Sequence, residues 1–225
     1  MAQSKQNLNS ADSITRGITL GHVAGIYDTL SPVMTFYQED RLSRKAMELL
    51  NLKGGEHVLD VGCGTGTLTI KIAEKLSSLS DDYRVVGLDA AAEMIKVCKQ
   101  KAKGVKNIRF DVEAAERLPY ADSSFDAVIS TFFFHHIDSE LKLAALLEIK
   151  RVLKDSRQLI IVDVAPPSNW FGSLCAWSGY FLFKQNEIKE NIHGKLIELM
   201  KKCNFSEFNK ISQHMGYVAI YSLKK

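Results

Sequence analysis

Hydrophobic residues follow two alternating spacings along most of the chain, one typical of buried strands and one typical of amphipathic helices. Short apolar runs predict strands of a parallel sheet covered on both faces. These runs are His57–Val61, Val85–Asp89, Asn107–Phe110, Phe125–Thr131 and Leu159–Val164. Apolar residues at helical spacing predict helices over 67–79, from 91 onward, over 140–153 and over 187–203. This alternation of strands and helices predicts an α/β fold.

The two ends of the chain add further elements. Residues 1–17 are polar and predict a flexible start, whereas residues 18–53 carry two helical patterns separated by Ser31-Pro32 and predict an N-terminal helical cap. Near the other end, strands predicted at 205–211 and 217–223 flank Gly216, which predicts an antiparallel hairpin at the edge of the sheet. Because no repeat or linker interrupts the pattern, we expect a single domain over 1–225.

Residues 165–183 form an aromatic-rich segment without a charged residue. The segment is short for a helix that spans a membrane, and its start is too polar. We favour a helical lid over 165–186 whose Trp170 and Trp177 line an apolar acceptor pocket. A surface that touches a membrane and an interface between two copies of the chain remain open as alternatives.

A glycine-rich turn follows the first strand. The sequence from Val58 to Gly66, VLDVGCGTG, places a buried strand before three glycines and a helix behind them. Glycines let the backbone turn tightly and let a ligand approach, and the N-terminus of the helix offers free N–H groups to that ligand. A dinucleotide site would have its last glycine at position 67, which is Thr67, and no lysine follows at P-loop spacing.

Two acids end apolar strands of the predicted sheet. Burial of the Asp60 carboxylate requires a partner, either a ligand ammonium or the backbone of the loop. Asp89 lies 23 residues after Gly66, where an acid in nucleotide-binding folds accepts hydrogen bonds from ribose hydroxyls. The alternative role for Asp89 is to cap the helix that begins near Ala91.

This glycine-rich motif resembles the first motif of class I S-adenosylmethionine-dependent methyltransferases, and downstream matches extend the resemblance over roughly residues 20–225. Among these enzymes, the chain is similar to the ubiquinone/menaquinone C-methyltransferase group. The resemblance implies a Rossmann-like three-layer sandwich with a mostly parallel seven-stranded sheet and an antiparallel last strand. It also implies S-adenosyl-L-methionine as the cofactor.

The resemblance implies contacts to each part of the cofactor. The glycine loop would hold its amino-acid end, Asp89 its ribose, and Met94 with Ala115 its adenine, while Tyr27 would close over it. The implied cofactor-binding residues are Tyr27, Asp60, Gly62, Cys63, Gly64, Thr65, Gly66, Asp89, Ala90, Met94, Ala114, Ala115, Glu116, Ser130 and Thr131.

The chain departs from the family pattern at Ala114, where the family has an acid that bonds the adenine amino group. Asp111 or Glu113 is a candidate to supply the missing acceptor. One such hydrogen bond contributes only about 0.5–1.5 kcal/mol, which an otherwise complete site can lack.

The residues after the fourth predicted strand are expected to face the reacting methyl group, because ligands of open α/β sheets bind beyond the carboxyl ends of the strands. Phe132, Phe133 and Phe134 predict an apolar wall for the acceptor. His135 and His136 are candidate general bases, since the ordinary pKa of histidine is near 6.5; the alternative is that they close a strand–helix junction. The quinone-pathway enzymes tend to have Arg-Asn at these two positions.

Charge and cysteine content limit the kinds of ligand and the compartment that we expect for this chain. A net charge of +3, without a clustered basic face, gives no reason to expect nucleic acid binding. The four cysteines form no C-x-x-C pair, so we expect no metal site and a reducing, cytoplasmic location.

The predicted function is methyl transfer from S-adenosylmethionine to a small apolar or aromatic acceptor. A non-catalytic cofactor-binding partner subunit is the main alternative, and Thr67 disfavours a nicotinamide oxidoreductase.

Overall fold

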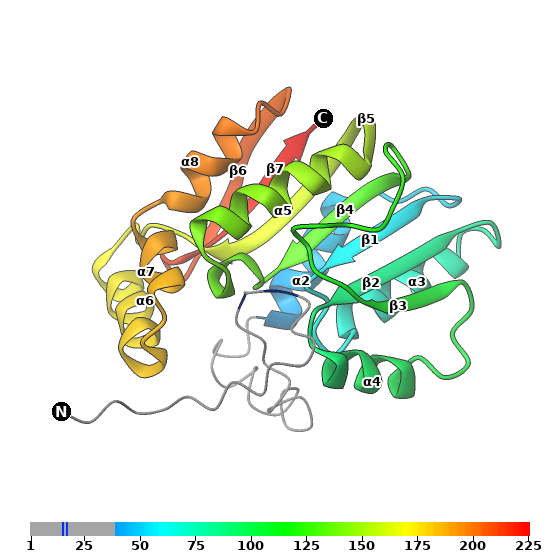
Figure 1. Cartoon of the computed structure of the whole chain (residues 1–225), viewed down its shortest axis with the longest axis horizontal. Helices are drawn as coiled ribbons and strands as arrows, with labels where there is room; N and C mark the ends of the chain where they lie inside the picture. The colour runs from blue at the N-terminus through cyan, green and yellow to red at the C-terminus, as the bar shows by residue number, and fades with distance from the viewer. Residues whose placement is uncertain (1–14, 16, 18–38) are drawn as a thin grey trace.

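The computed structural model describes residue 15, residue 17 and residues 39–225, and within them seven strands form one sheet in the order β3-β2-β1-β4-β5-β7-β6 (Figure 1). The strands are β1 (His57–Val61), β2 (Arg84–Asp89), β3 (Ile108–Val112), β4 (Phe125–Thr131), β5 (Leu153–Val164), β6 (Glu207–His214) and β7 (Val218–Lys224). Strands β1 to β5 pair in parallel, and β7 is antiparallel to both β5 and β6. The predicted mostly parallel sheet with an antiparallel last strand is confirmed.

Helices cover both faces of the sheet and complete three layers (Figure 1). They are α2 (Glu39–Leu49), α3 (Thr67–Ser77), α4 (Ala92–Lys101), α5 (Ser139–Val152), α6 (Trp170–Phe183), α7 (Asn186–Ile192) and α8 (Lys195–Lys202), with a short 3-10 helix η2 (Phe134–His136) between β4 and α5. The central strands are buried on both sides, which explains why their sequences are continuous apolar runs.

Alternate residues of the central strands belong to two separate cores. Leu59 and Val61 of β1 pack in the core that includes α5 and α8, whereas Val58 packs in the core that includes α2 and α3. Side chains of successive strand residues point to opposite faces, so one apolar strand supplies both layers. The helix α2, which falls in the predicted N-terminal cap, packs against the sheet face through Leu42 and Ala46; the rest of that cap and the predicted flexible start lie almost entirely outside the described residues.

The C-terminal hairpin forms at the predicted position. Three residues connect the strands; Met215 and Gly216 have positive φ, 48° and 75°, and the Tyr217 N–H donates to the His214 carbonyl at 3.1 Å, which closes a tight turn. The turn places β7 between β5 and β6, so that β7 closes the parallel part of the sheet and β6 becomes its edge.

Two predicted elements are corrected by the structure. The single helix expected over 187–203 is divided into α7 and α8, because Gly194 takes a left-handed conformation with φ of 86° at the start of α8. The strand expected over 159–164 begins earlier, at Leu153. In the ladder between β4 and β5, Phe125 pairs with Leu153 and Ala127 pairs with Gln158. One residue of β4 therefore lies opposite four residues of β5, so residues 154–157 form a bulge where a turn was expected.

The uncharged segment forms the helix α6 at the edge of the molecule, beside α7 (Figure 1). No helix within the described part of the chain has both the length and the apolar character required to cross a membrane.

A buried ion pair joins α5 to α7. The side chain of Lys142 is completely buried, and its Nζ donates to Glu190 Oε2 at 2.7 Å and to the Glu187 carbonyl at 3.3 Å. Glu190 is one-third exposed, at 33%. A buried ammonium group is strongly destabilising when its counter-charge is removed, so this contact fixes α7 against α5.

Substitution Glu190→Gln removes the counter-charge and keeps the shape of the side chain. We expect the free energy of unfolding, measured by urea denaturation, to fall by roughly 3 kcal/mol, the lower end of the cost of breaking a buried ion pair. Addition of Lys142→Met to that variant is expected to recover most of the loss. The matched control is Glu198→Gln, which breaks the more exposed Lys195–Glu198 pair at 2.8 Å and is expected to cost less than about 1 kcal/mol. Equal losses in the two variants would contradict the prediction.

Candidate functional site

The carboxyl ends of β1, β2, β4 and β5 meet at one edge of the sheet, and the glycine loop lies there. The N–H groups of Gly62 and Cys63 both donate to the Leu88 carbonyl at 2.9 Å, which ties the loop to the end of β2. Gly62, with φ of 72°, has the Phe133 ring against it; a Cβ at Gly62 would lie 2.5 Å from that ring. At Gly64, with φ of 53°, a Cβ would meet no atom of the described residues within 4 Å apart from its chain neighbours, so none of them fills the space at this glycine.

Asp89 lies beside this loop with part of its hydrogen-bonding capacity in use. Its carboxylate accepts the Gly64 N–H at 3.1 Å and the Ala91 N–H at 2.9 Å. Burial raises the pKa of Asp89, and these two backbone bonds oppose the rise. The residue that caps α4 is Ala91, so Asp89 is not the helix cap considered as its alternative role.

Asp60 is the least satisfied of the buried acids. Its Oδ2 accepts the Thr69 hydroxyl at 2.6 Å, whereas its buried Oδ1 has no hydrogen-bond partner within the described part of the chain. Burial raises the pKa of Asp60 to about 7, opposed by the Thr69 bond and reinforced by the nearby charge of Asp89. A buried carboxylate oxygen without a partner among the described residues fits the ammonium group of S-adenosylmethionine, and Asp89, bonded to the glycine loop, fits its ribose hydroxyls.

The two thiols of this region are structural. Cys98 Sγ donates to the Gly64 carbonyl at 3.1 Å, and Cys63 Sγ lies 3.9 Å from the same oxygen. Burial raises the pKa of the Cys63 thiol well above its ordinary value, and the neighbouring Cys98 thiol adds to the rise. Cys63 is therefore a neutral thiol rather than a nucleophile, and Cys98 supports the loop through its bond to the Gly64 carbonyl.

The predicted adenine side lies at the loop after β3. Ala114 and Ala115 are buried, and Met94 packs with Ala91 in a small cluster. Of the two candidate replacements for the acid missing at Ala114, Asp111 already accepts the Tyr120 hydroxyl at 2.9 Å and pairs with Arg109. Glu113 makes no side-chain hydrogen bond within the described residues, which leaves it the better placed of the two.

The remaining predicted cofactor residues differ in exposure and partners. Ser130 is buried, and its hydroxyl donates to the Val61 carbonyl at 2.9 Å, so it joins β4 to β1. Glu116 accepts the Thr15 hydroxyl at 2.5 Å. Thr65 is buried, and Ala90 and Thr131 are half-buried at this edge. Tyr27 lies outside the described residues.

The three phenylalanines after β4 have different surroundings. Phe132 takes a strained left-handed conformation with φ of 53° and donates its N–H to the Val162 carbonyl at 2.8 Å. Phe133 packs on Gly62, and Phe134 is fully buried in the core. Phe132 and Phe133 are thus at the edge of the site, while Phe134 packs in the hydrophobic core next to it.

Both histidines are half-buried beside the same buried acid, Asp163, which the sequence interpretation did not include. His135 Nδ1 lies 2.9 Å from Asp163 Oδ1, and the rings of His135 and His136 are 4.0 Å apart. The signal that could have identified Asp163 is the one used for Asp60 and Asp89, an acid near the end of an apolar strand.

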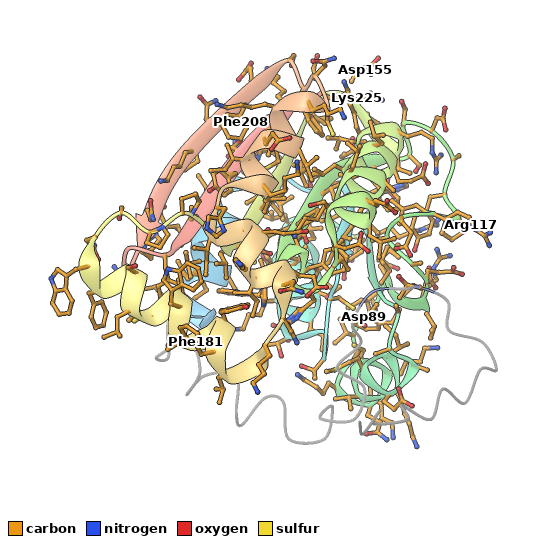
Figure 2. All side chains as sticks on the ribbon, turned by 60° about the vertical axis from the view of Figure 1, so that its left-hand side comes forward. Asp89, Arg117, Asp155, Phe181, Phe208 and Lys225 are labelled. Atoms are coloured by element: carbon orange, nitrogen blue, oxygen red, sulfur yellow. The ribbon has the colours of Figure 1, made fainter. Side chains whose placement is uncertain are left out.

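The helix α6 has one face outward. Trp170 is 77% exposed and Phe181 is 68% exposed; Figure 2 shows Phe181 on the outer side of α6, away from Asp89. Trp177 is half-buried and lies against Tyr180 and His193. The two tryptophans predicted to line one acceptor pocket therefore have different environments.

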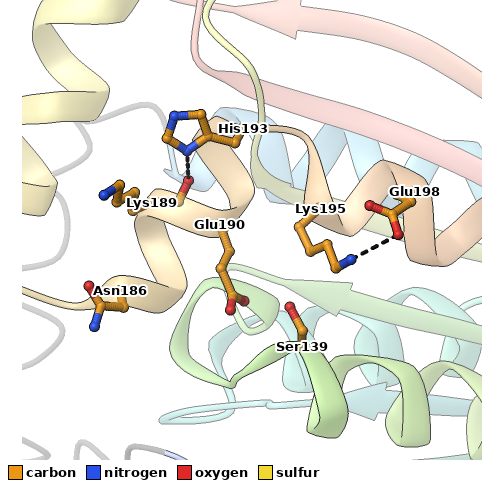
Figure 3. A pocket seen from close by; sticks show the side chains of 7 residues that line it. All are labelled: Ser139, Asn186, Lys189, Glu190, His193, Lys195 and Glu198. Atoms are coloured by element: carbon orange, nitrogen blue, oxygen red, sulfur yellow. Dashed lines mark hydrogen bonds and ion pairs between the residues drawn. The ribbon is translucent and has the colours of Figure 1, made fainter.

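A polar hollow of about 490 Å³ lies between the start of α5 and the helices α7 and α8 (Figure 3). Its lining residues are Ser139, Asn186, Lys189, Glu190, His193, Lys195 and Glu198. None of them belongs to the predicted cofactor or acceptor site.

Comparisons with known proteins match the chain to methyltransferases. Residues 58–156 match the family described as "Methyltransferase domain". A demethylmenaquinone methyltransferase of Staphylococcus saprophyticus is 30% identical over 162 residues, which cover 72% of this chain and 67% of that protein. A ubiquinone/menaquinone biosynthesis C-methyltransferase of Citrifermentans bemidjiense is 30% identical over 66% of this chain and 62% of that protein. The chain therefore spans about two thirds of the length of these relatives.

The fold has a close structural counterpart. The crystal structure of a S-adenosylmethionine-dependent methyltransferase from Aquifex aeolicus superposes with a TM-score of 0.65 at 20% identity, covering 92% of this chain and 98% of that one.

The chain belongs to the S-adenosylmethionine-dependent methyltransferases. In this methyltransferase, the resemblance drawn from the glycine loop is confirmed, and S-adenosylmethionine is the cofactor of the family.

If Asp60 holds the ammonium group of the cofactor, its raised pKa is expected to make cofactor binding depend on pH. Only the carboxylate pairs with an ammonium group, so affinity is expected to rise as the pH increases through 7. With a pKa of about 7, calorimetric titration with S-adenosylhomocysteine should give a Kd roughly tenfold lower near pH 8 than near pH 6.

The variant Asp60→Asn tests whether Asp60 causes this pH dependence, because Asp89 is a second, half-buried acid with a raised pKa. The asparagine variant is expected to bind more weakly and to lose the tenfold change. An unchanged pH dependence in Asp60→Asn would show that another group titrates.

Proposed function

We propose that this protein transfers the methyl group of S-adenosylmethionine to a small acceptor with an apolar or aromatic body. The observation that carries the proposal is that the buried Oδ1 of Asp60, near the carboxyl end of β1, has no hydrogen-bond partner among the described residues. Phe132 and Phe133 follow β4, which pairs with β1 in parallel, so they lie at the same end of the sheet. This arrangement supports a cofactor site and an aromatic-walled acceptor site as neighbours.

The residues of the chain have mainly binding and positioning roles in this reaction. Asp60 would hold the ammonium group, Asp89 the ribose hydroxyls, and the backbone near Ala115 the adenine. When bound, S-adenosylmethionine supplies an already activated methyl group on a sulfonium. The protein therefore has to align the acceptor and exclude water, and such positioning can supply on the order of 7–11 kcal/mol.

The acceptor that fits best is a quinone-type aromatic ring in its reduced, hydroxyl-bearing form. Support comes from the relatives, which are named as methyltransferases of demethylmenaquinone and of ubiquinone/menaquinone biosynthesis. The His135-His136 pair, where the quinone enzymes tend to have Arg-Asn, indicates that the contacts to the ring differ in this chain.

The alternative is a partner or regulatory subunit that binds the cofactor without turnover. The absence of an acid at Ala114 is the observation that favours it. The two proposals agree on cofactor binding and differ only on methyl transfer, so one assay separates them.

The cofactor site is tested by titration with S-adenosylhomocysteine of the wild-type chain, Asp89→Ala and Gly64→Val. We expect binding to the wild type and its loss, by at least about tenfold in Kd, in both variants. The matched control is Gly104→Val, because Gly104 also has positive φ, 86°, and also faces open space, but lies after α4. Equal losses in Gly64→Val and Gly104→Val would indicate general destabilisation.

Activity is then measured as transfer of labelled methyl from S-adenosylmethionine to reduced demethylated naphthoquinones, other hydroquinones, phenols and amines. Labelled product supports the enzyme proposal. Cofactor binding without transfer to any of these acceptors would favour the partner-subunit alternative, and absence of binding would remove both.

A further inference from the structure

The carboxylate of Asp163 is the most completely satisfied acid at the sheet edge. It is fully buried and accepts four donors: the Phe134 N–H at 2.8 Å, the Val164 N–H at 2.7 Å, Asn191 Nδ2 at 3.1 Å and His135 Nδ1 at 2.9 Å. These donors come from η2, β5 and α7, so Asp163 fixes the segment after β4 against the helix α7. Its surroundings favour the ionised form.

The ionised state of Asp163 determines the tautomer of His135. Burial alone would raise the pKa of Asp163, but His135 and the backbone N–H bonds outweigh it and lower the pKa. An ionised carboxylate can only accept hydrogen bonds, so His135 Nδ1 must carry the proton. In the neutral imidazole, Nε2 then carries the lone pair that can accept a proton.

His136 differs from His135 in this respect. Burial lowers the pKa of His136 to about 3, and repulsion from His135 adds to the effect. Its Nδ1 lies 3.3 Å from Gln185 Oε1, just before α7. His136 is therefore neutral at physiological pH, and its ring, 4.0 Å from that of His135, serves to hold the neighbouring imidazole in place.

The location of His135 connects it to the cofactor loop. It follows Phe133, whose ring packs on Gly62, and it lies on η2 directly after β4, the strand that pairs with β1. A base in this position is at the edge where acceptor and cofactor must meet, and 13% of its side chain is exposed.

We propose that His135 Nε2 is the general base of the reaction, that Asp163 and Asn191 position it, and that the acceptor is therefore a phenol, hydroquinone or enol. This inference rests on the proposed function. It assigns the base to one of the two adjacent histidines and gives a chemical reason for the hydroxyl group of the proposed acceptor.

The step balances as a proton transfer coupled to a substitution. His135 Nε2 takes the hydroxyl proton of the acceptor, and the electron pair left on oxygen, or delocalised to the adjacent ring carbon, becomes the nucleophile. The new bond to methyl carbon forms while the carbon–sulfur bond of S-adenosylmethionine breaks with its electron pair remaining on sulfur. The positive charge passes to the His135 imidazolium, which the Asp163 carboxylate stabilises. Attack through ring carbon is followed by loss of the proton on that carbon.

A hydroxyl acceptor needs such a base more than an amine does. A neutral aromatic amine attacks with its own lone pair, whereas a phenolic hydroxyl with a pKa near 10 is a weak nucleophile until it loses its proton. General base catalysis commonly contributes about 10²–10⁴ in rate. The buried, four-donor carboxylate behind His135 is consistent with a site organised for that purpose.

The first test is nitrogen-15 NMR of the histidine side chains in the ligand-free full-length chain, which does not depend on turnover. The signals of His135 are assigned by their absence in His135→Gln. We expect a protonated Nδ1 and an unprotonated Nε2 at neutral pH, and loss of this single tautomer in Asp163→Asn. A His135 with its proton on Nε2 would overturn the proposal. Because Asp163→Asn alters a buried carboxylate, Asn191→Leu provides a milder variant that removes one donor to Asp163.

The second test compares two acceptors of similar shape, naphthohydroquinone and aminonaphthalene, with labelled S-adenosylmethionine. The wild type is expected to methylate the hydroquinone, and His135→Gln to do so with kcat lowered at least about 100-fold. The Kd for S-adenosylhomocysteine should stay within about twofold, which separates loss of a base from loss of the site. The matched control is His193→Gln, an exposed histidine at the end of α7, for which no change is expected.

The outcomes distinguish this inference from the function on which it rests. Cofactor binding with equal turnover of the hydroquinone by wild type and His135→Gln would overturn the base and leave the methyltransferase proposal intact. Methylation of the amine but not the hydroquinone, or of neither by a chain that binds the cofactor, would overturn the acceptor class. Failure of the wild type to bind S-adenosylhomocysteine would instead remove the proposed function itself.

Discussion

Buried carboxylates at the ends of apolar strands are the constraint on which the site depends. Each of three strands carries an acid close to its carboxyl end. Asp60 and Asp163 are buried and Asp89 is half-buried, and burial of a carboxylate without partners is costly. Asp163 has four donors and a lowered pKa, Asp89 has two donors and a raised pKa, and Asp60 has one donor and a pKa raised to about 7. Asp60 and Asp89 therefore retain hydrogen-bonding capacity that a polar ligand can satisfy.

The same edge is held together from three directions. Gly62 allows the Phe133 ring to pack directly on the glycine loop, and Ser130 joins β4 to β1. Asp163 then connects the segment after β4 to α7, through His135 on one side and Asn191 on the other. Cofactor loop, candidate base and helical layer are therefore parts of one packed unit, and their relative positions follow from the sheet order.

Fold prediction succeeded where local pattern and core packing agree. The apolar runs predicted the parallel strands correctly, because a strand buried on both faces has a continuous apolar sequence in any sheet order. It failed where a single backbone conformation decides the outcome. Gly194 divides the last predicted helix, and residues 154–157 bulge from β5, since register is a property of two strands together.

For the site, the sequence by itself determined the glycine loop, the two acids that flank it and the pair of histidines, because these are local patterns with their own chemistry. Only the tertiary structure brought Asp163 to His135, across 28 residues, and Asn191 to Asp163. It also separated the two histidines by environment and placed Trp170 outside. Burial and hydrogen bonding between distant segments depend on packing, and adjacency in the sequence does not specify them.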